Sequence, residues 1–448
     1  MDNAAAYRVG MIGLGTVGQS VAAMLQEHAA LYAQRAGRPV RLGRVLVRSL
    51  AKAHQAVSEG GWFDPAILTD DPDAFFASGA PNNIDCVLEV AGGVASAEPL
   101  VRRSLETGRH VVTANKALLA AKGADLFALA RQHEKCVAFE ASCGGGIPCV
   151  TALCAGLSAN RIDALVGILN GTCNYILTQM GKHGRTYKHA LQEAQELGFA
   201  EADPTLDVSG ADAGQKLAVL AALAFGARID GDAVVCQGVD TVTPADLAFG
   251  AELGYELKLL GIAERDAQDG ITLGVSPCFV RKDDPLAQVA GSFNALSVYA
   301  PDLGHTLYYG RGAGGRPTAS AVIADLLGVV TGWAPALFQG LRLTPDLHAP
   351  ATMGHAQDIE SRFYLRLEAA DQPGVMAQVT GALGDAGISL SALIQHESDE
   401  TGQGRAVPLV ITTHKAKLGA VRQAAQQIGE LESVDGPPVV LRVFDPPA

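Results

Sequence analysis

A glycine-rich turn close to the N-terminus limits the choice of fold. Gly13-Leu14-Gly15-Thr16-Val17-Gly18 has the spacing GxGxxG, follows an expected strand at residues 8–13 and opens an expected helix at residues 17–35. In that context the glycines allow a tight turn and a close approach of backbone to a pyrophosphate at the helix N-terminus. The pattern predicts that a dinucleotide binds at Gly13, Gly15, Thr16, Val17 and Gly18. The alternative is a glycine turn that serves only packing.

Strand and helix patterns alternate along the first 140 or so residues. Such alternation indicates βαβ units and therefore an α/β fold with a Rossmann-type, doubly wound parallel sheet. We predict a dinucleotide-binding domain at residues 1–150, completed by residues 310–346, which include a helix from Thr318 to about residue 330. Further strands are expected at 40–47, 84–90, 110–113 and 136–140, and further helices at 97–106 and 117–133.

Beyond residue 150 the pattern of expected strands and helices changes twice. Residues 151–309 predict a central mixed α/β domain for substrate binding and dimerisation, and residues 347–361 have the Pro, Gly and polar composition of a linker. Residues 362–448 show the order βαββαβ, which is the ferredoxin-like arrangement. A helix in this tail is expected to start at Pro373 and to end before Gly387. In the central domain, strands are expected at 164–169, 255–264, 271–280 and 293–309, and helices near 186–198 and 209–227.

Composition excludes several classes of function. With 448 residues, 48% hydrophobic and 18% charged, the chain has a globular composition and room for two or three domains. The formal charge of −13 argues against nucleic acid or an anionic membrane as the main partner. Eight cysteines without a CxxC predict neither a zinc site nor a disulfide framework. The N-terminus lacks the pattern of a secretory signal, so we expect a cytoplasmic protein.

The end of the second strand bears on the choice of cofactor. An NAD site usually has an acidic residue there for the ribose 2′-hydroxyl. This chain has Arg48 and Lys52 instead, with no acid before Glu59. These cations suit a 2′-phosphate and favour NADP, with NAD as the alternative if both are ordinary surface charges.

A charged pair stands on the apolar face of an expected helix. Asp212 and Lys216 are four residues apart and share a helical face, which by itself is typical of a weak surface ion pair. At about 100° per residue, however, Val219, Leu220 and Leu223 bracket the same direction. Charges on a buried face are costly unless a polar cavity receives them, so the pattern favours a functional site.

Two other residues are candidates for chemistry. Lys116 follows the strand at residues 110–113, and ligands of open α/β sheets bind at the carboxyl ends of strands. A lysine there can orient a carbonyl group or exchange a proton with it, although a lone lysine is usually a solvated loop residue. Cys143, beside Gly144, could be a thiol nucleophile, but no histidine pairs with it recognisably and free cysteines are more often buried and inert.

Five motifs follow one another in a recognisable order. They are the glycine turn, Thr113-Ala114-Asn115-Lys116, Asn170-Gly171-Thr172-Cys173-Asn174-Tyr175-Ile176-Leu177, the run 198–216 and the run 312–321. Together they resemble homoserine dehydrogenase over residues 7 to about 345. The tail sequence Asp371-Gln372-Pro373-Gly374-Val375 is similar to an ACT domain, an amino-acid-sensing module.

The resemblance implies a reaction and roles for individual residues. The reaction is the reversible NAD(P)-linked interconversion of L-homoserine and L-aspartate 4-semialdehyde in the biosynthesis of threonine, methionine and isoleucine. A lysine ammonium suits this chemistry, because it neutralises the alkoxide left by hydride transfer and supplies the proton. The catalytic lysine corresponds to Lys216, with Asp212 and Asp207 near the reacting group, Lys116 near nicotinamide and substrate, Glu201 at the substrate ammonium group, and Gly312 at the cofactor.

The family also carries a sodium ion in a loop that corresponds to Glu140, Cys143, Gly145 and Ile147. Cys143 replaces a small apolar residue there, and Cys173 replaces the more usual threonine of its motif. A backbone carbonyl is the expected ligand at Cys143.

Two rival functions differ in their requirements. A semialdehyde dehydrogenase would need an activated cysteine, a histidine base and phosphate. A non-catalytic NADP-sensing regulator would need no buried lysine beside an acid. For the tail we expect L-threonine as feedback effector, with a tail that only stabilises the oligomer as the alternative, and for the whole chain a homodimer or homotetramer. We also expect the linker to let the tail be removed without exposing the catalytic core.

Overall fold

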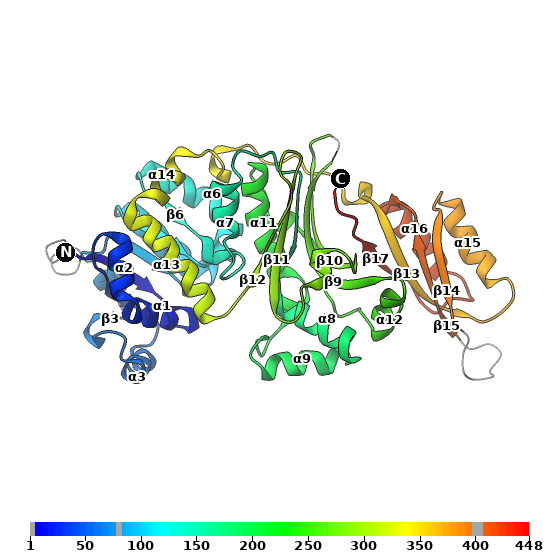
Figure 1. Ribbon diagram of the computed structural model, residues 1–448, viewed down its shortest axis with the longest axis horizontal. Coiled ribbons are helices and arrows are strands. Elements are labelled where there is room, and N and C mark those ends of the chain that lie inside the picture. The colour runs from blue at the N-terminus through cyan, green and yellow to red at the C-terminus, as the bar shows by residue number, and fades with distance from the viewer. Residues whose placement is uncertain (1–4, 78–82, 267, 397–405, 448) are drawn as a thin grey trace. The chain divides into compact units, whose positions relative to one another are not determined.

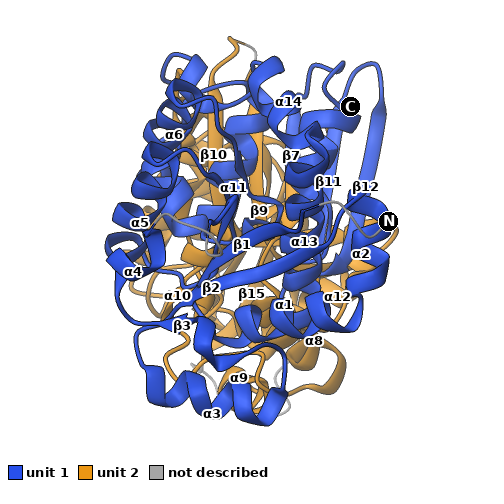
Figure 2. Ribbon diagram, turned by 90° about the vertical axis from the view of Figure 1, so that its left-hand side faces the viewer, with its two compact units in different colours: residues 1–165, 215–234, 294–351 blue, residues 166–214, 235–293, 352–448 orange. Residues whose placement is uncertain are grey.

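The computed structural model describes residues 5–77, 83–266, 268–396 and 406–447 (Figure 1). The chain divides into two compact units (Figure 2). Unit 1 comprises residues 1–165, 215–234 and 294–351, and unit 2 comprises residues 166–214, 235–293 and 352–448. The helix α11 (Ala211–Phe225) and the strand β7 (Ala164–Ile168) each carry residues of both units. The predicted domain boundaries stay predictions.

Unit 1 contains a six-stranded sheet in the order β3-β2-β1-β4-β5-β6. Each pair of neighbours is parallel, which confirms the predicted Rossmann-type sheet. The central strand β4 is buried along its whole length, because both faces of a parallel sheet are covered, whereas β2 carries two arginines. Their bounds are β1 (Tyr7–Ile12), β2 (Val40–Leu46), β3 (Leu68–Thr69), β4 (Cys86–Glu89), β5 (His110–Thr113) and β6 (Val137–Ala138).

Helices cover this sheet on both faces. In Figure 2, α1, α2 and α13 lie to one side of β1, and α5 and α6 to the other. The helix expected at residues 17–35 is two helices, because His28 leaves the helical conformation with φ −113° and ψ 23°. The bounds are α1 (Thr16–Glu27), α2 (Ala29–Ala36), α3 (Leu50–Gly60), α4 (Pro72–Phe76), α5 (Val94–Glu106), α6 (Lys116–Gln132), α7 (Cys149–Thr151), α13 (Gly315–Thr331) and α14 (Trp333–Gly340).

Two later strands, apart from Phe293 at the start of the first, also belong to unit 1. β11 (Phe293–Ala300) and β12 (Gly304–Arg311) are neighbours in their sheet and lead into α13, which packs on α1. Contact between these helices is close at Gly315, where an added Cβ would lie 3.2 Å from the carbonyl oxygen of Thr16. The run after Gly310 therefore contributes α13, which packs on α1 within unit 1.

Unit 2 contains strands in the order β9-β10-β17-β13-β15-β14. A long antiparallel pair, β9 (Tyr255–Arg265) and β10 (Ile271–Arg281), pairs along its full length, and β8 (Val235–Cys236) adds to β10. The motif that begins at Asn170 forms a helix, α8, which the periodicity did not predict; the Asn170 side chain caps it. The helices here are α8 (Gly171–His183), α9 (Tyr187–Glu196), α10 (Thr205–Val208) and α12 (Pro244–Glu252).

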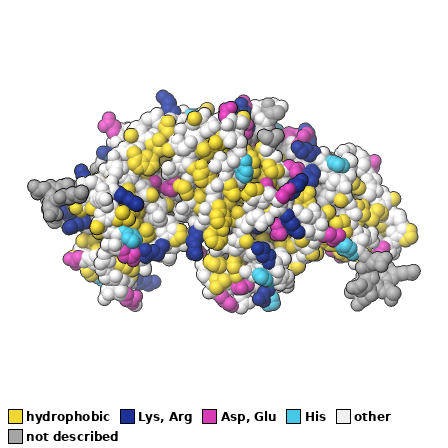
Figure 3. All heavy atoms as spheres, viewed as in Figure 1, with side chains coloured by type: hydrophobic (Ala, Val, Ile, Leu, Met, Phe, Trp, Pro, Cys, Tyr) yellow, Lys and Arg dark blue, Asp and Glu magenta, His cyan; other side chains and the backbone are white. Residues whose placement is uncertain are grey.

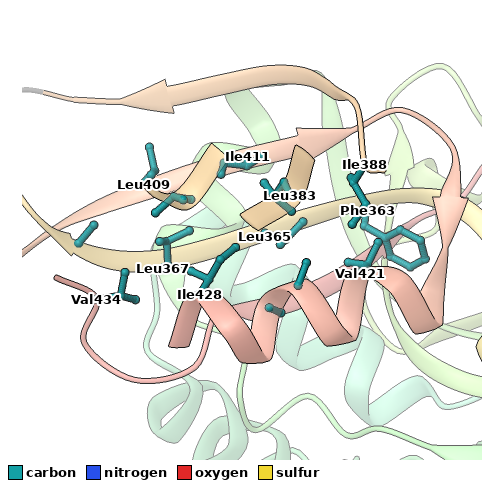
Figure 4. Packing of buried hydrophobic residues seen from close by; sticks show 14 of the residues in the cluster. Phe363, Leu365, Leu367, Leu383, Ile388, Leu409, Ile411, Val421, Ile428 and Val434 are labelled. Atoms are coloured by element: carbon teal, nitrogen blue, oxygen red, sulfur yellow. The ribbon is translucent and has the colours of Figure 1, made fainter. Parts of the chain in front are cut away.

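The tail forms the predicted βαββαβ unit. Its antiparallel strands lie in the order β17-β13-β15-β14, and apolar side chains from the sheet and both helices form one buried cluster around Leu365, Leu383 and Ile428 (Figure 4). The first helix starts at Val375, two residues after the predicted Pro373, with Gly374 in the left-handed region as its N-cap. The elements are β13 (Glu360–Ala370), α15 (Val375–Asp385), β14 (Leu390–Gln395), β15 (Ala406–Thr413), β16 (Ala416–Lys417), α16 (Leu418–Gly429) and β17 (Val439–Val443).

The expectation that the tail can be removed cleanly is wrong. β17 pairs with β10, so the tail and the β9–β10 strands share one sheet within unit 2. Tyr364 of β13 is fully buried, with its ring 4.7 Å from that of Phe279, and its hydroxyl donates to Asp246. Removing the tail would leave the edge of β10 and an apolar face uncovered, and would separate the buried Asp246 from Arg366.

Basic and acidic side chains are interspersed on the face drawn in Figure 3. All eight cysteines are free thiols. Within the described ranges, no single helix has both the length and the hydropathy of a membrane span, although α13 and residues 333–347, bent by 84°, pass that test as a pair.

Candidate functional site: the cofactor crevice of unit 1 and the acidic network of unit 2

The three glycines of the turn have three different environments. Gly13 has φ +100°, and an added Cβ would lie 2.8 Å from the Cα of Ala91. A Cβ on Gly18 would lie 2.4 Å from the carbonyl oxygen of Gly13, so this glycine lets α1 pack against the turn. Around Gly15 there is open space, and α1 begins there without a capping side chain or an acidic residue in its first turn. The arrangement fits a pyrophosphate, because free helix-terminal amides favour an anion.

A buried carboxylate organises the next two strand ends. Glu89, at the end of β4, is fully buried, and its Oε1 accepts the backbone amides of Ala91 and Gly92. Its Oε2 accepts the hydroxyl of Thr113 at 2.7 Å, which joins the carboxyl ends of β4 and β5. Sequence reasoning missed Glu89. A lone acid at the end of an apolar strand was the available signal, since such a residue is rarely buried without specific donors.

The predicted lysine at this edge begins a helix. Lys116 is the first residue of α6 and is half-buried. The preceding Asn115 caps α6 by accepting the amide of Leu118, and its side-chain nitrogen donates to the carbonyl of Gly93. Lys116 therefore stands beside the loop that follows β4, at the carboxyl edge of the sheet.

The cations proposed for the 2′-phosphate are exposed beyond β2. Arg48 lies in the turn between β2 and α3, and Lys52 lies in the first turn of α3. Ser49 caps α3 by accepting the amide of Lys52. Both cations are thus near a helix N-terminus at the strand end where the adenine ribose of a dinucleotide binds.

The predicted catalytic lysine is buried. Lys216 on α11 is only 9% exposed, as its helical face predicts. Its backbone carbonyl accepts the thiol of Cys143 at 3.8 Å. Burial raises the pKa of Cys143 to about 11, with Lys216 and Lys116 acting in the opposite direction. A thiol that stays protonated at neutral pH is a poor nucleophile, so Cys143 fits the alternative of a buried, inert cysteine.

The loop predicted to hold sodium starts at Glu140, whose buried carboxylate accepts hydrogen bonds from two backbone amides. Glu140 is 4% exposed, and its two carboxylate oxygens accept the amides of Val150 and Thr151 at 2.8 and 2.7 Å. Its own amide donates to Asp325, and burial raises the pKa of both carboxyl groups. The Glu140 carboxylate is therefore already engaged with backbone amides, and the carbonyl of this residue is the ligand that we expect for a cation.

In unit 2 a buried asparagine joins two of the predicted acids. The side-chain nitrogen of Asn170, which is 3% exposed, donates to Asp207 and to Asp212, both at 2.8 Å. Its oxygen accepts the amide of Cys173, and the thiol of Cys173 donates to the carbonyl of Asp207 at 3.2 Å. In the sequence Asn170 stands out only as part of a motif. Its hydrogen bonds to Asp207 and Asp212 could not be predicted there, because these residues are 37 and 42 positions away.

Glu201 stands outside this network. It is exposed in the turn between α9 and α10, and its backbone carbonyl accepts the side chain of Gln195. The two acids that are brought together are thus Asp207 and Asp212, within hydrogen-bond reach of one amide.

Comparison with known proteins decides the family. Residues 13–140 match the family model of the homoserine dehydrogenase NAD-binding domain, residues 148–327 match the model of homoserine dehydrogenase, and residues 363–430 match the ACT domain. A homoserine dehydrogenase of Pseudomonas aeruginosa is 41% identical over 439 residues, covering 97% of this chain and 98% of that protein. The chain belongs to the homoserine dehydrogenase family. A homoserine dehydrogenase of Neisseria gonorrhoeae is 38% identical, covering 97% of this chain and 98% of that protein.

A solved structure is similar to this one over nearly the whole length of both chains. The crystal structure of a homoserine dehydrogenase from Thiobacillus denitrificans has a TM-score of 0.89 at 39% identity, covering 98% of this chain and 99% of that one. The chain is therefore an oxidoreductase of the homoserine dehydrogenase family with a site for NAD(P) and an ACT domain. This result removes the rival semialdehyde dehydrogenase and the non-catalytic regulator.

Proposed function

We propose that this homoserine dehydrogenase interconverts L-homoserine and L-aspartate 4-semialdehyde, with NADP as its preferred cofactor and a role in threonine, methionine and isoleucine biosynthesis. The observation that carries the proposal is the burial of Lys216 one helical turn from Asp212, in a chain with this family's motifs. Initial rates of homoserine oxidation in phosphate-free buffer test it. A requirement for phosphate, or no turnover with either nicotinamide cofactor, would reject it.

Each polar residue has a proposed task. When bound, the nicotinamide accepts or donates the hydride. Lys216 holds a proton at the substrate oxygen, so that negative charge formed there is neutralised. Asp212, held by Asn170, orients this lysine, and Asp207 belongs to the same hydrogen-bonded pair. Lys116 binds on the nicotinamide side, and the exposed Glu201 binds the substrate ammonium group.

The sodium ion of the family remains part of the proposal. Backbone carbonyls are hard, neutral donors that suit such a cation. Gly144 and Gly145 have φ values of +74° and +57°, which turn the backbone of the loop sharply. We propose that the carbonyls of Glu140, Cys143, Gly145 and Ile147 would hold the ion, and that the ion would fix this loop. In this proposal the Glu140 carboxylate keeps its hydrogen bonds to the amides of Val150 and Thr151.

Replacing Arg48 by alanine is expected to weaken NADP binding by about 5- to 20-fold and NAD binding far less, because only NADP carries the 2′-phosphate. Dissociation constants for both cofactors, measured by fluorescence titration, check this. Arg41→Ala is the matched control, since Arg41 is an exposed arginine on β2 itself. Equal losses for both cofactors with Arg48→Ala would contradict the preference for NADP.

We also propose that the ACT domain binds L-threonine and inhibits the dehydrogenase, and that the chain works as a homodimer or homotetramer in the cytoplasm. A module of this kind binds an amino acid between paired copies, so regulation and oligomerisation are linked in the proposal. Threonine is chosen because it is a downstream product of homoserine. Sedimentation with and without threonine measures the oligomer.

Saturating L-threonine is expected to slow homoserine oxidation by full-length enzyme several-fold, since allosteric coupling typically amounts to about 1–3 kcal/mol. The full chain is needed because β17 pairs with β10 and the tail cannot be removed cleanly. Initial rates and titration calorimetry check the expectation, with D-threonine as the control. No change of rate and no binding heat with L-threonine would leave the tail with a purely structural role.

A further inference from the structure

A cavity in unit 2 lies between the ACT domain and the β9–β10 pair. Its volume is about 310 Å³, near the small end of the range for small-molecule sites. β10 forms its floor, where the half-buried Thr272, Gly274 and Ser276 alternate with the buried Leu273 and Val275. Because alternate residues of a strand face the same side of a sheet, the cavity lies on the face of Thr272, Gly274 and Ser276.

The cavity arises because two strands share one edge of β10. β8 pairs with β10 at Gly274 and Val275, whereas β17 pairs with it at Cys278 and Phe279. Val440, two residues before the β17 pairing begins, pairs with β13 and not with β10. The opening between the two strands is therefore set by backbone pairing and does not depend on the rotamer of one side chain.

Two arginines and one carboxylate line this cavity. Arg422 of α16 is exposed and has neither a hydrogen bond nor an ion pair with any residue that the structure describes. Arg442 of β17 donates to Glu264 Oε1 at 3.0 Å and to Ser361, and the side chains of Arg442 and Glu264 are 14% and 26% exposed. In the described part of the chain, Arg442 Nη1 and Glu264 Oε2 keep free hydrogen-bonding capacity. Cations thus outnumber the carboxylate.

Apolar side chains form the walls. Ile262 of β9, Leu418 of α16 and Val440 of β17 line the cavity beside Phe363, which belongs to the buried cluster drawn in Figure 4. Leu418 and Arg422 are four residues apart on α16 and therefore lie on the same face of that helix. A ligand in this space would place an apolar body against these side chains and an acidic group at the guanidinium.

The cavity also contacts the segment that carries the two proposed acids. The amide of Gln237, a lining residue, donates to the carbonyl of Val275 at 2.7 Å. A Cβ added to Gly210 would lie 3.0 Å from Val275 Cγ1 and 3.5 Å from the carbonyl oxygen of Gln237. Gly210 stands between Asp207 and Asp212, and its amide donates to the Asp207 carbonyl at 3.1 Å. A shift of the lining would therefore move the backbone between these acids.

We propose that this cavity binds a small aliphatic carboxylate and that its occupancy regulates the dehydrogenase. A carboxylate suits the unpartnered guanidinium of Arg422, because arginine binds carboxylates through paired N–H donors. The volume suits a molecule of amino-acid size rather than a nucleotide. An L-amino acid and the 2-oxo acid of the same skeleton share this chemistry, and an ammonium group would in addition pair with Glu264 Oε2.

This site is separate from the one proposed for L-threonine. It lies within a single chain, between α16 and β10, whereas the threonine site is proposed between paired copies of the ACT domain. Only the regulatory part of the proposal rests on the proposed function, because binding is measured without turnover.

Ligand-observed NMR titrations of the full-length protein test binding. L-Leucine and its 2-oxo acid, α-ketoisocaproate, share one carbon skeleton, and isoamylamine keeps that skeleton without the carboxylate. At least one of the two carboxylates is expected to bind saturably, and the amine far more weakly. Glu264→Gln distinguishes the two sources, since it should weaken only a ligand whose ammonium group pairs with Glu264.

Two variants alter the cavity by different means. Arg422→Ala removes the guanidinium and should weaken carboxylate binding about 10-fold or more, the usual effect of losing a charge-assisted hydrogen bond. Gly274→Val fills the floor and should abolish binding. A Cβ at Gly274 would meet only the carbonyl oxygen of Val235, at 3.6 Å, and Gly274 does not have a left-handed φ, so the strand accepts a side chain. If Gly274→Val nevertheless fails to fold, Arg422→Ala decides alone.

Lys415→Ala is the matched control. Lys415 is an exposed cation of the ACT domain that does not line the cavity, so this variant should bind the probes as wild type does. No saturable binding, equal binding of isoamylamine, or binding that neither Arg422→Ala nor Gly274→Val weakens would overturn the site.

Homoserine oxidation, measured in parallel, tests the regulation. A saturating probe is expected to change the KM for homoserine several-fold in wild-type enzyme, the usual range of allosteric coupling, and to have little effect in Arg422→Ala. Binding without any change of kinetics overturns the regulatory role. Absence of homoserine turnover rejects the proposed function, and the binding result then stands by itself.

Discussion

Lys216→Ala is expected to lower kcat for homoserine oxidation by about 10²- to 10⁴-fold, the usual contribution of a positioned proton-transfer group. NADPH should still bind, because Lys216 lies on α11, whereas the pyrophosphate is expected at the turn Gly13–Gly18. Stopped-flow single turnovers and fluorescence titration measure the two effects separately. Thermal unfolding is measured in parallel, since the side chain is 9% exposed and its removal also changes packing.

The controls for this variant distinguish charge from position. Lys188→Ala removes an exposed lysine of α9 and should leave kcat unchanged. Lys116→Ala is the informative comparison, because Lys116 is the other lysine assigned to the reaction. A near-normal kcat in Lys216→Ala together with a large loss in Lys116→Ala would transfer the proton-transfer role to Lys116.

Asp246→Ala is expected to destabilise the protein by about 3–5 kcal/mol, the usual cost of removing one partner of a buried ion pair. Asp246 is fully buried and accepts Arg366 Nε at 2.7 Å and the hydroxyl of Tyr364 at 3.1 Å. Its other oxygen caps α12 by accepting the amide and hydroxyl of Thr243. Without it the guanidinium, 11% exposed, retains only Glu368 as an ion-pair partner among the described residues.

Urea unfolding measures this loss, and an exposed pair supplies the control. Arg281 and Asp283 form an ion pair with side chains 59% and 68% exposed. Removing Asp283 should cost about 0–1 kcal/mol. The double variant Asp246→Ala, Arg366→Met should recover part of the loss, because no buried charge is left unpaired. A loss for Asp246→Ala no larger than that for Asp283→Ala would show that this contact does not hold the ACT domain to the rest of unit 2.

Residue spacing was enough to predict the features that depend on local pattern. The turn at Gly13–Gly18, the parallel strands, the βαββαβ order of the tail and the inward face of α11 all follow from residue spacing, because helices and strands repeat with periods of 3.6 and 2. Lys216 was found in this way, since three apolar neighbours on one helix mark its direction. The residues at strand ends, such as Lys116, follow from the rule that ligands bind there.

The contacts between polar groups could not be predicted from residue spacing. Glu89 accepts a hydroxyl 24 residues away, Asn170 joins acids 37 and 42 residues away, and Asp246 pairs with an arginine 120 residues away. The same holds for the pairing of β17 with β10, which makes the C-terminal tail part of the sheet that contains β9 and β10. Local periodicity reports whether a side chain faces inward. It does not predict which residue that side chain contacts, because the contact depends on the packing of segments that are distant in the chain.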